Sequence, residues 1–218
     1  FTFRVGVTTV VDAGGAGWKS FPLFKKNIID NSQTRVLSLL NIVGEGMRGG
    51  AYEQDTHDMD PKMAAFVAKQ YKEFVVGFKV AHFSGPEWIP VDRAVEAGKL
   101  ANMPVMIDFG GNTPPLPIEE LFMKHLRPGD IYTHTYTLLD GNVRETVVDE
   151  ATGKVKPFIW DARKRGIIFD VGYGGASFNF TQAIPSIKAG FYPNTISTDL
   201  HTGSMNTSMK DQLSVMSK

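Results

Sequence analysis

Seven short runs of apolar and β-branched residues recur along the chain, and helical patterns or polar loops separate them. Their starts lie about 25–40 residues apart, a spacing typical of strand–helix units. The runs cover residues 5–13, 35–43, 75–82, 104–109, 130–137, 167–171 and 195–200. One helical pattern starts at residue 18, and others cover residues 60–71, 91–102, 118–126, 158–165, 180–189 and 209–218. This alternation predicts an α/β fold with a parallel sheet, because parallel strands need a crossover connection.

Two architectures satisfy the alternation: a doubly wound open sheet and a (β/α)8 barrel of the TIM type. A polar side chain stands near the carboxyl end of each run, and a barrel collects its functional residues at that face. We therefore expect a barrel. Eight strand–helix units need about 250 residues, so a chain of 218 residues is about one unit short.

The chain reads as one domain, residues 1–218, that belongs to a longer protein. It starts at Phe1 close to a strand pattern and stops within a helical one. We therefore expect truncation at both ends, with activity belonging to the complete protein and not to these residues alone.

Composition excludes several classes of function. The formal net charge is zero, so nucleic acid and anionic membranes are not expected as partners, and no run approaches the roughly 20 apolar residues of a membrane helix. Cysteine is absent, which excludes disulfides, thiolate metal sites and a cysteine nucleophile. We expect a cytoplasmic protein with a small-molecule substrate. The oligomeric state stays open, a homo-oligomer included.

Lys79 lies inside the apolar run VVGFKVAH, residues 75–82. Lysine is rarely buried, because its ammonium group is costly to remove from water. An isolated strand would favour a lysine that extends to solvent. A buried lysine would instead meet an anion or act as an uncharged amine with chemistry of its own, and the other strand ends favour this second alternative.

Polar residues near the ends of the seven runs would meet at the mouth of a barrel. They are Asp12, Asn41, Lys79, Asp108, His134, Asp170 and Asp199. Carboxylates and imidazoles are ligands for Zn, Mn, Fe or Ni. Loop amides can also satisfy a polar strand end, and we favour this structural role for Asp12, Asn41 and Asp170. For the lysine, the histidine and the last aspartate together we favour a metal site.

Five segments form a combination that is specific, although each is weak alone. They are GVTTVVDAG (6–14), VVGFKV (75–80), LRPGDIYTH (126–134), RGIIFDVGYGGASF (165–178) and ISTDLH (196–201). In this order they resemble the amidohydrolase superfamily, most closely its dihydroorotase-like branch of amidohydrolase/deacetylase metallohydrolases. The resemblance covers essentially the whole chain.

The resemblance implies a (β/α)8 barrel of which strands two to eight are present, whereas the first strand, with its HxH pair, and the C-terminal part are missing. It implies one or two divalent metal ions, most often zinc, and a Lys79 that is carboxylated by CO2 or bicarbonate, so that its carbamate can bridge two such ions. His134 matches the sixth-strand histidine ligand. Asp199 matches the eighth-strand aspartate, which contacts the first metal and transfers protons in catalysis.

Two positions depart from the family pattern. Asp108 stands where relatives carry the fifth-strand histidine, and because a carboxylate can ligate the same ions it is a candidate ligand. Tyr173 stands where close relatives often have histidine, and it is a candidate for substrate contact. His201 and Asn41 are further candidates for substrate contact.

A long polar loop, residues 44–59, carries Arg48, Glu53 and His57 and could set substrate specificity. A solvated loop is the simpler interpretation. His82, three residues beyond Lys79, could support that lysine or contact substrate.

The leading hypothesis is a metal-dependent amidohydrolase or deacetylase that cleaves amide or ester-like carbonyl bonds in a small substrate, with metal-activated water as nucleophile. The alternative is a catalytically degenerate barrel that acts as a binding or structural homologue. Asp108, Tyr173 and the missing first strand motivate this alternative.

Overall fold

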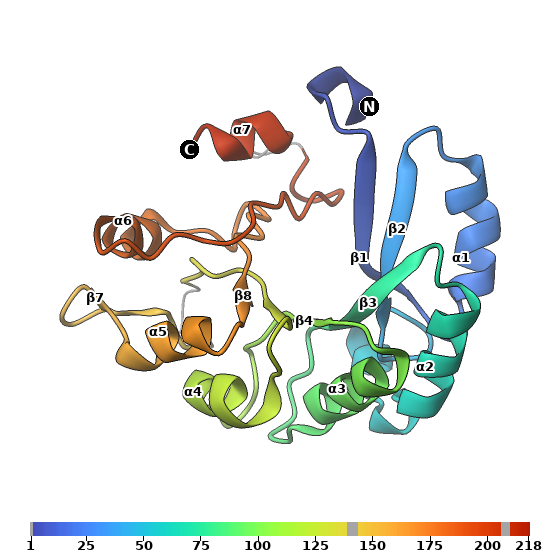
Figure 1. Ribbon diagram of the computed structural model, residues 1–218, viewed down its shortest axis with the longest axis horizontal. Coiled ribbons are helices and arrows are strands. Elements are labelled where there is room, and N and C mark those ends of the chain that lie inside the picture. Colours follow the sequence, from blue (N-terminus) through green and yellow to red (C-terminus); the bar gives the residue numbers. More distant parts are fainter. Residues whose placement is uncertain (1, 139–143, 206–209) are drawn as a thin grey trace. The chain divides into compact units, whose positions relative to one another are not determined.

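The computed structural model describes residues 2–138, 144–205 and 210–218. The chain divides into two compact units, unit 1 (Phe1–Phe109) and unit 2 (Gly110–Lys218). Among the described residues, strands β1 to β4 belong to unit 1 and β5 to β8 to unit 2 (Figure 1). The predicted single domain over residues 1–218 stays a prediction.

Four parallel strands form the sheet of unit 1, in the order β1-β2-β3-β4. They are β1 (Thr9–Gly17), β2 (Arg35–Asn41), β3 (Val75–Val80) and β4 (Val105–Ile107). The register pairs Lys79 with Asn41 on one side and with Met106 on the other. Because aligned residues of paired strands point to the same face, Asn41 and Lys79 share one face of this sheet.

Three helices connect these strands and lie on one side of them in Figure 1. They are α1 (Phe21–Asn27), α2 (Pro61–Gln70) and α3 (Ile89–Ala101), and the 3-10 turns of unit 1 are η1 (Thr2–Val5), η2 (Ile29–Asn31), η3 (Gly50–Gln54) and η4 (Thr56–Asp58). Asp60 caps α2 as predicted: its carboxylate accepts hydrogen bonds from the backbone N–H groups of Lys62 and Met63, at 2.9 and 3.1 Å. Asn102, the residue after α3, has the left-handed backbone of a helix C-cap, φ 55°.

Unit 2 has shorter strands. β5 (Ile131–Tyr132) and β8 (Ile168–Phe169) are parallel neighbours, whereas β6 (Val148–Asp149) and β7 (Lys154–Val155) form an antiparallel hairpin. The helices are α4 (Ile118–Glu120), which continues into the π-helical turn η5 (Leu121–His125), α5 (Pro157–Lys164), α6 (Phe180–Lys188) and α7 (Gln212–Met216).

Phe122, Tyr132 and Phe169 are fully buried and pack edge to face, with ring centroids 5.0 to 6.1 Å apart. This aromatic cluster joins η5 to the two parallel strands.

Three expectations about strands are wrong. Residues 195–200 form no strand beyond a single bridge between Thr195 and Asp170. β1 continues to Gly17, so Asp12 lies inside a strand and not at its end. Residues 140–154 lie outside the seven strand runs that the sequence predicts, yet among the described residues they contain β6 and the start of β7, where Val148 and Val155 are paired and buried. Residues 140–143 of that segment, and residue 209 of the expected last helix, lie outside the described residues.

The predicted α/β class with parallel strands is confirmed. The closed barrel and the numbering of its strands stay predictions. Across the part of the chain that the structure describes, every helix is too short or too polar to cross a membrane.

Replacing Asp60 by alanine removes the acceptor for two N–H groups at the start of α2. We expect the free energy of unfolding to fall by about 1 kcal/mol, measured by urea unfolding of the complete protein that contains this chain. The Asp60→Ser variant keeps a capping oxygen and should stay close to the parent protein. Equal stability of the alanine and serine variants would contradict the capping role.

Candidate active site

Lys79 is buried in β3, with 3% of its surface exposed. Its side chain lies against Gly14 of β1. A Cβ atom at Gly14 would stand 2.9 Å from Lys79 Cβ and 2.7 Å from Lys79 Cγ. The backbone of Gly14 is also left-handed, φ +95°. Gly14 therefore makes room for the lysine, and the predicted burial of Lys79 is confirmed.

The polar site candidates of β1 and β2, Asp12 and Asn41, have hydrogen-bond partners within unit 1. Asn41 donates from Nδ2 to the carbonyl of Gly14 at 3.1 Å and accepts at Oδ1 from the N–H of Val43 at 3.0 Å. Asp12 accepts hydrogen bonds from the N–H of Gly15 and the hydroxyl of Ser38, at 3.0 and 3.2 Å.

Burial raises the pKa of Asp12, and the hydrogen bonds from Gly15 and Ser38 oppose this rise. The geometry agrees with the structural role that we favour for Asp12 and Asn41. The substrate contact considered for Asn41 stays a prediction.

Asp108 follows β4 directly and lies beside a pair that the sequence did not reveal. Its N–H donates to the carbonyl of Val80 at 3.0 Å, which extends the pairing of β3 and β4. Its Oδ2 lies 3.7 Å from Nε2 of His82, and Nδ1 of His82 lies 2.8 Å from Oε2 of Glu53. The carboxyl edge of unit 1 thus holds a carboxylate, an imidazole and a second carboxylate in a row.

Glu53 is buried, with 2% of its surface exposed, although the sequence favours a solvated loop for residues 44–59. The loop is fastened at several points. Gln54 donates from Nε2 to the carbonyl of His82 at 2.7 Å and accepts from the N–H of Ser84 at 2.9 Å, while Arg93 of α3 donates to the carbonyl of Met59 at 3.2 Å. The solvated interpretation is therefore wrong for Glu53, because the turns η3 and η4 direct its carboxylate inward.

His134 follows β5 in unit 2 and is buried, with a left-handed backbone, φ 58°. Its Nδ1 lies 2.6 Å from the carbonyl oxygen of Gly172. Because a carbonyl oxygen only accepts, Nδ1 carries the proton, and in the neutral ring the lone pair is on Nε2. Metal-binding histidines commonly have their second nitrogen held in this way. A Cβ atom at Gly172 would lie 2.7 Å from that Nδ1, so the contact requires glycine.

Asp199 is exposed and left-handed, φ 48°, and its carboxylate lies against Gly174. A Cβ atom at Gly174 would stand 2.5 Å from Asp199 Oδ2. The N–H of Gly174 donates to the carbonyl of Thr198 at 2.9 Å, and the N–H of Tyr173 donates to the carbonyl of Ser197 at 3.1 Å. These bonds hold Asp199 beside residues 172–174 although no strand forms there.

Asp170, directly after β8, has the structural role that we expected. Its Oδ2 accepts hydrogen bonds from the hydroxyls of Thr133 and Ser197, at 2.7 and 2.6 Å, and its Oδ1 accepts from the hydroxyl of Thr195 at 2.6 Å. Three separate segments of unit 2 therefore meet at this buried carboxylate.

The other substrate candidates have partners of their own. Tyr173 is buried, and its hydroxyl lies 2.9 Å from Nζ of Lys218. His201 is exposed, and its Nδ1 accepts from the N–H of Gly203 at 3.2 Å. Substrate contact by either residue stays a prediction.

The predicted metal ligands are divided between the units. Lys79 and Asp108 belong to unit 1, whereas His134 and Asp199 belong to unit 2. Within the described ranges 2–138, 144–205 and 210–218, no three side chains of histidine, aspartate or glutamate are arranged to hold a metal ion. The joint ligand set stays a prediction.

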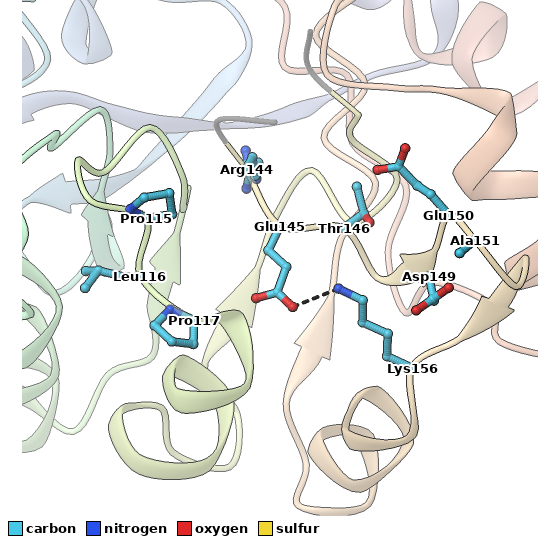
Figure 2. A pocket seen from close by; sticks show the side chains of 10 residues that line it. All are labelled: Pro115, Leu116, Pro117, Arg144, Glu145, Thr146, Asp149, Glu150, Ala151 and Lys156. Carbon is cyan, nitrogen blue, oxygen red and sulfur yellow. Dashed lines mark hydrogen bonds and ion pairs between the residues drawn. The ribbon is translucent and has the colours of Figure 1, made fainter. Parts of the chain in front are cut away.

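A separate cavity of about 480 Å³ lies in unit 2 (Figure 2). Its lining residues are Pro115, Leu116, Pro117, Arg144, Glu145, Thr146, Asp149, Glu150, Ala151 and Lys156. Glu145 is held there by an ion pair with Lys156 at 2.7 Å, drawn in Figure 2, and by the N–H of Ile118 at 2.9 Å. None of the predicted site residues lines this cavity, so it is not the site built above.

Comparisons with known proteins connect both units to one family. No family model matches the chain. The chain is 33% identical to a deacetylase of Agrobacterium fabrum, over 98% of this chain and 52% of the relative, and 32% identical to a deacetylase of Brucella anthropi, over 98% and 53%. A third deacetylase, from Enterococcus faecalis, is 31% identical over 91% of this chain and 53% of its own length. The chain thus spans about half the length of the curated relatives it matches.

Two solved structures share the fold. A crystal structure of an adenine deaminase aligns with 99% of this chain and 59% of its own, with a TM-score of 0.85 and 26% identity. A crystal structure of a dihydroorotase aligns with 97% of this chain and 55% of its own, with a TM-score of 0.79 and 31% identity. These matches are to members of the amidohydrolase superfamily, deacetylases among them, and they confirm the resemblance found in the sequence.

Replacing Gly14 by alanine in the complete protein that contains this chain tests the contact with Lys79. The new Cβ overlaps the lysine stem, so we expect the free energy of unfolding to fall by about 1–3 kcal/mol more than φ strain alone would cause. Gly6 is the matched control, because it also has a left-handed backbone, φ +77°, with no atom within 4 Å of an added Cβ. Urea unfolding of Gly14→Ala and Gly6→Ala gives the comparison, and equal losses would contradict the packing role of Gly14.

Proposed function

We propose that the protein containing this chain is a metal-dependent hydrolase of amide or ester-like carbonyl bonds in a small substrate, of the deacetylase or cyclic-amide hydrolase type. The observation that carries the proposal is Lys79, a lysine buried against Gly14 in a chain that aligns with deacetylases over 98% of its length. Removing the ammonium group of a lysine from water costs free energy, so a buried lysine indicates a specific role.

We infer that the fold of the complete protein is a closed (β/α)8 barrel in which this chain supplies strands two to eight. The parallel strands of each unit and the alignment of 99% of the chain with the adenine deaminase structure support this inference. In such a barrel the functional residues stand at the carboxyl ends of the strands.

The donor set of the chain fits divalent metal ions. Lys79, as a carbamate formed with CO2 or bicarbonate, and the imidazole of His134 would be ligands, together with Asp199 and with Asp108 as a further ligand. Two observations support this fit. Lys79 is buried, and burial disfavours the charged form of a lysine. The carbonyl of Gly172 accepts from Nδ1 of His134, which leaves the lone pair of the neutral ring on Nε2. Zinc is the expected ion, because nitrogen and oxygen ligands of this kind suit it.

When bound, such an ion activates water and polarises a substrate carbonyl at neutral pH. The residues of the chain supply the rest of the chemistry. Asp199, exposed and held against Gly174, would accept the proton of the attacking water and transfer it to the leaving group. A small-molecule substrate belongs to this proposal. The cytoplasmic location stays a prediction, and the oligomeric state stays open.

A catalytically degenerate homologue is the second candidate. Asp108 favours it, because an aspartate stands where the family pattern has histidine. A screen for activity distinguishes the two candidates, because a degenerate homologue would release no product whether or not it binds metal or substrate.

The test is a screen of the complete protein, loaded with zinc and bicarbonate, against N-acetyl amino acids, acetylated hydroxy acids and cyclic amides. For an accepted substrate, Lys79→Ala should lower kcat/KM by about 100-fold or more, since a lost metal bridge removes several kcal/mol of transition-state stabilisation. Lys72→Ala is the control, because Lys72 precedes the same strand and is exposed. Protein that turns over no candidate substrate after loading, or a Lys79→Ala variant with parental activity, would refute the proposal.

A further inference from the structure

Asp170, directly after β8, holds two separate segments of unit 2 through one carboxylate oxygen. Its Oδ2 accepts hydrogen bonds from the hydroxyl of Thr133 at 2.7 Å and from the hydroxyl of Ser197 at 2.6 Å. Thr133 directly precedes His134, and Ser197 stands two residues before Asp199. Both site candidates of unit 2 therefore lie next to a segment that is bound to the same buried carboxylate.

The main chain of Asp170 is fixed independently of its side chain. Its N–H donates to the carbonyl of Tyr132 at 2.9 Å, and its carbonyl accepts from the N–H and the hydroxyl of Thr135, at 3.1 and 2.8 Å. The next N–H, that of Val171, donates to the carbonyl of Thr195 at 3.0 Å. The carboxylate thus extends from a backbone that is bound on both sides. Removing one hydroxyl donor from it should leave this backbone in place.

The residues that follow Asp170 contact the same two site candidates. The carbonyl of Gly172 accepts from Nδ1 of His134 at 2.6 Å, and the carboxylate of Asp199 lies against Gly174. His134 and Asp199 both have left-handed backbones, φ 58° and 48°. Such conformations persist only where the surroundings hold them. The hydroxyl bonds to Asp170 hold the chain immediately before each of these two turns.

We propose that Asp170 is a positioning residue for His134 and Asp199, which it aligns through the hydroxyls of Thr133 and Ser197. The inference deepens the proposed function and rests on it in one respect, because the alignment affects the reaction only if the two residues belong to the site. A purely structural carboxylate would instead affect stability alone, to a similar extent through each of its hydroxyl donors. Loss of a group that orients a metal ligand typically lowers metal affinity or activity about 10–100-fold.

The first experiment observes the ring of His134 without any assay of activity. In 15N-labelled complete protein, the Nδ1 proton of His134 is identified by its loss in His134→Asn, because asparagine tolerates a left-handed backbone. Thr133→Val removes one hydroxyl and keeps the shape of the side chain, so exchange of this proton with solvent should become about 10-fold faster or more. Thr133→Ser keeps the hydroxyl and should restore the parental rate. Unchanged exchange in Thr133→Val would overturn the proposal.

Thr195→Val is the matched control. The hydroxyl of Thr195 bonds the same carboxylate, at Oδ1 and 2.6 Å, but neither sequence neighbour of Thr195 is a site candidate. This variant should lower the melting temperature about as much as Thr133→Val does, and it should leave exchange of the His134 proton close to the parental rate. Equal acceleration of exchange by the two variants would indicate a general loosening of unit 2 and would contradict the positioning role.

The second experiment measures zinc affinity and kcat/KM of the complete protein. Thr133→Val should lower zinc affinity about 10–100-fold through His134, and Ser197→Ala should lower kcat/KM by a similar factor through Asp199. The variants that keep a hydroxyl, Thr133→Ser and Ser197→Thr, should stay close to the parent protein. Thr195→Val, measured well below its melting temperature, should do the same. Parental zinc affinity in Thr133→Val together with parental kcat/KM in Ser197→Ala would refute the alignment.

The outcomes separate this inference from the proposed function. An active enzyme in which Thr133→Val, Ser197→Ala and Thr195→Val behave alike would overturn the positioning role and leave the hydrolase intact. A complete protein that is inert to every substrate, but whose His134 proton responds to Thr133→Val and not to Thr195→Val, would refute the hydrolase and support the hold of Asp170 on His134.

Discussion

Close contact between a glycine backbone and a functional side chain is the constraint on which the rest of the candidate site depends. The side chains of Lys79, His134 and Asp199 each lie where a Cβ atom on the neighbouring glycine would come within 2.9 Å. The three glycines, Gly14, Gly172 and Gly174, all have left-handed backbones. These are the three residues that match the family pattern. The glycine-rich sequences after the first and sixth runs therefore shape the site by leaving space for its side chains.

The second constraint is the loop of residues 44–59, which the structure binds to the carboxyl edge of unit 1. A loop that long exposes many backbone groups and would be mobile without partners. The buried carboxylate of Glu53 and the amide of Gln54 instead attach it to His82 and Ser84, and Arg93 attaches it to α3. The loop gains order from these bonds, and His82 gains a fixed orientation. Any contribution of the loop to specificity would therefore come from a rigid surface.

Local chemistry could be read from the sequence, whereas contacts between distant segments could not. Asp60 and Pro61 predict the start of α2, and the apolar neighbours of Lys79 predict a buried strand, because each signal comes from residues a few positions apart in the sequence. Glu53 and His82 are 29 positions apart, and no local pattern joins them. Residues 195–200 have the composition of a strand, but beyond Thr195 they accept hydrogen bonds from two consecutive N–H groups, those of Tyr173 and Gly174, whereas a parallel ladder uses every second residue. The family resemblance indicated which residues are site candidates, whereas the contacts that hold each of them depend on how distant segments pair.

Three of the site candidates share a backbone conformation that explains why their residue types suit both structure and chemistry. His82, His134 and Asp199 all have positive φ, between 48° and 58°. His82 and His134 each stand two residues after a strand, so a left-handed backbone turns the chain away there and keeps the side chain near the carboxyl end of that strand. Histidine and aspartate enter this region more readily than β-branched residues do, and asparagine shares the tendency. An asparagine at these positions keeps the turn while it removes the imidazole or the carboxylate, and so it separates the chemical role of each residue from its part in the fold.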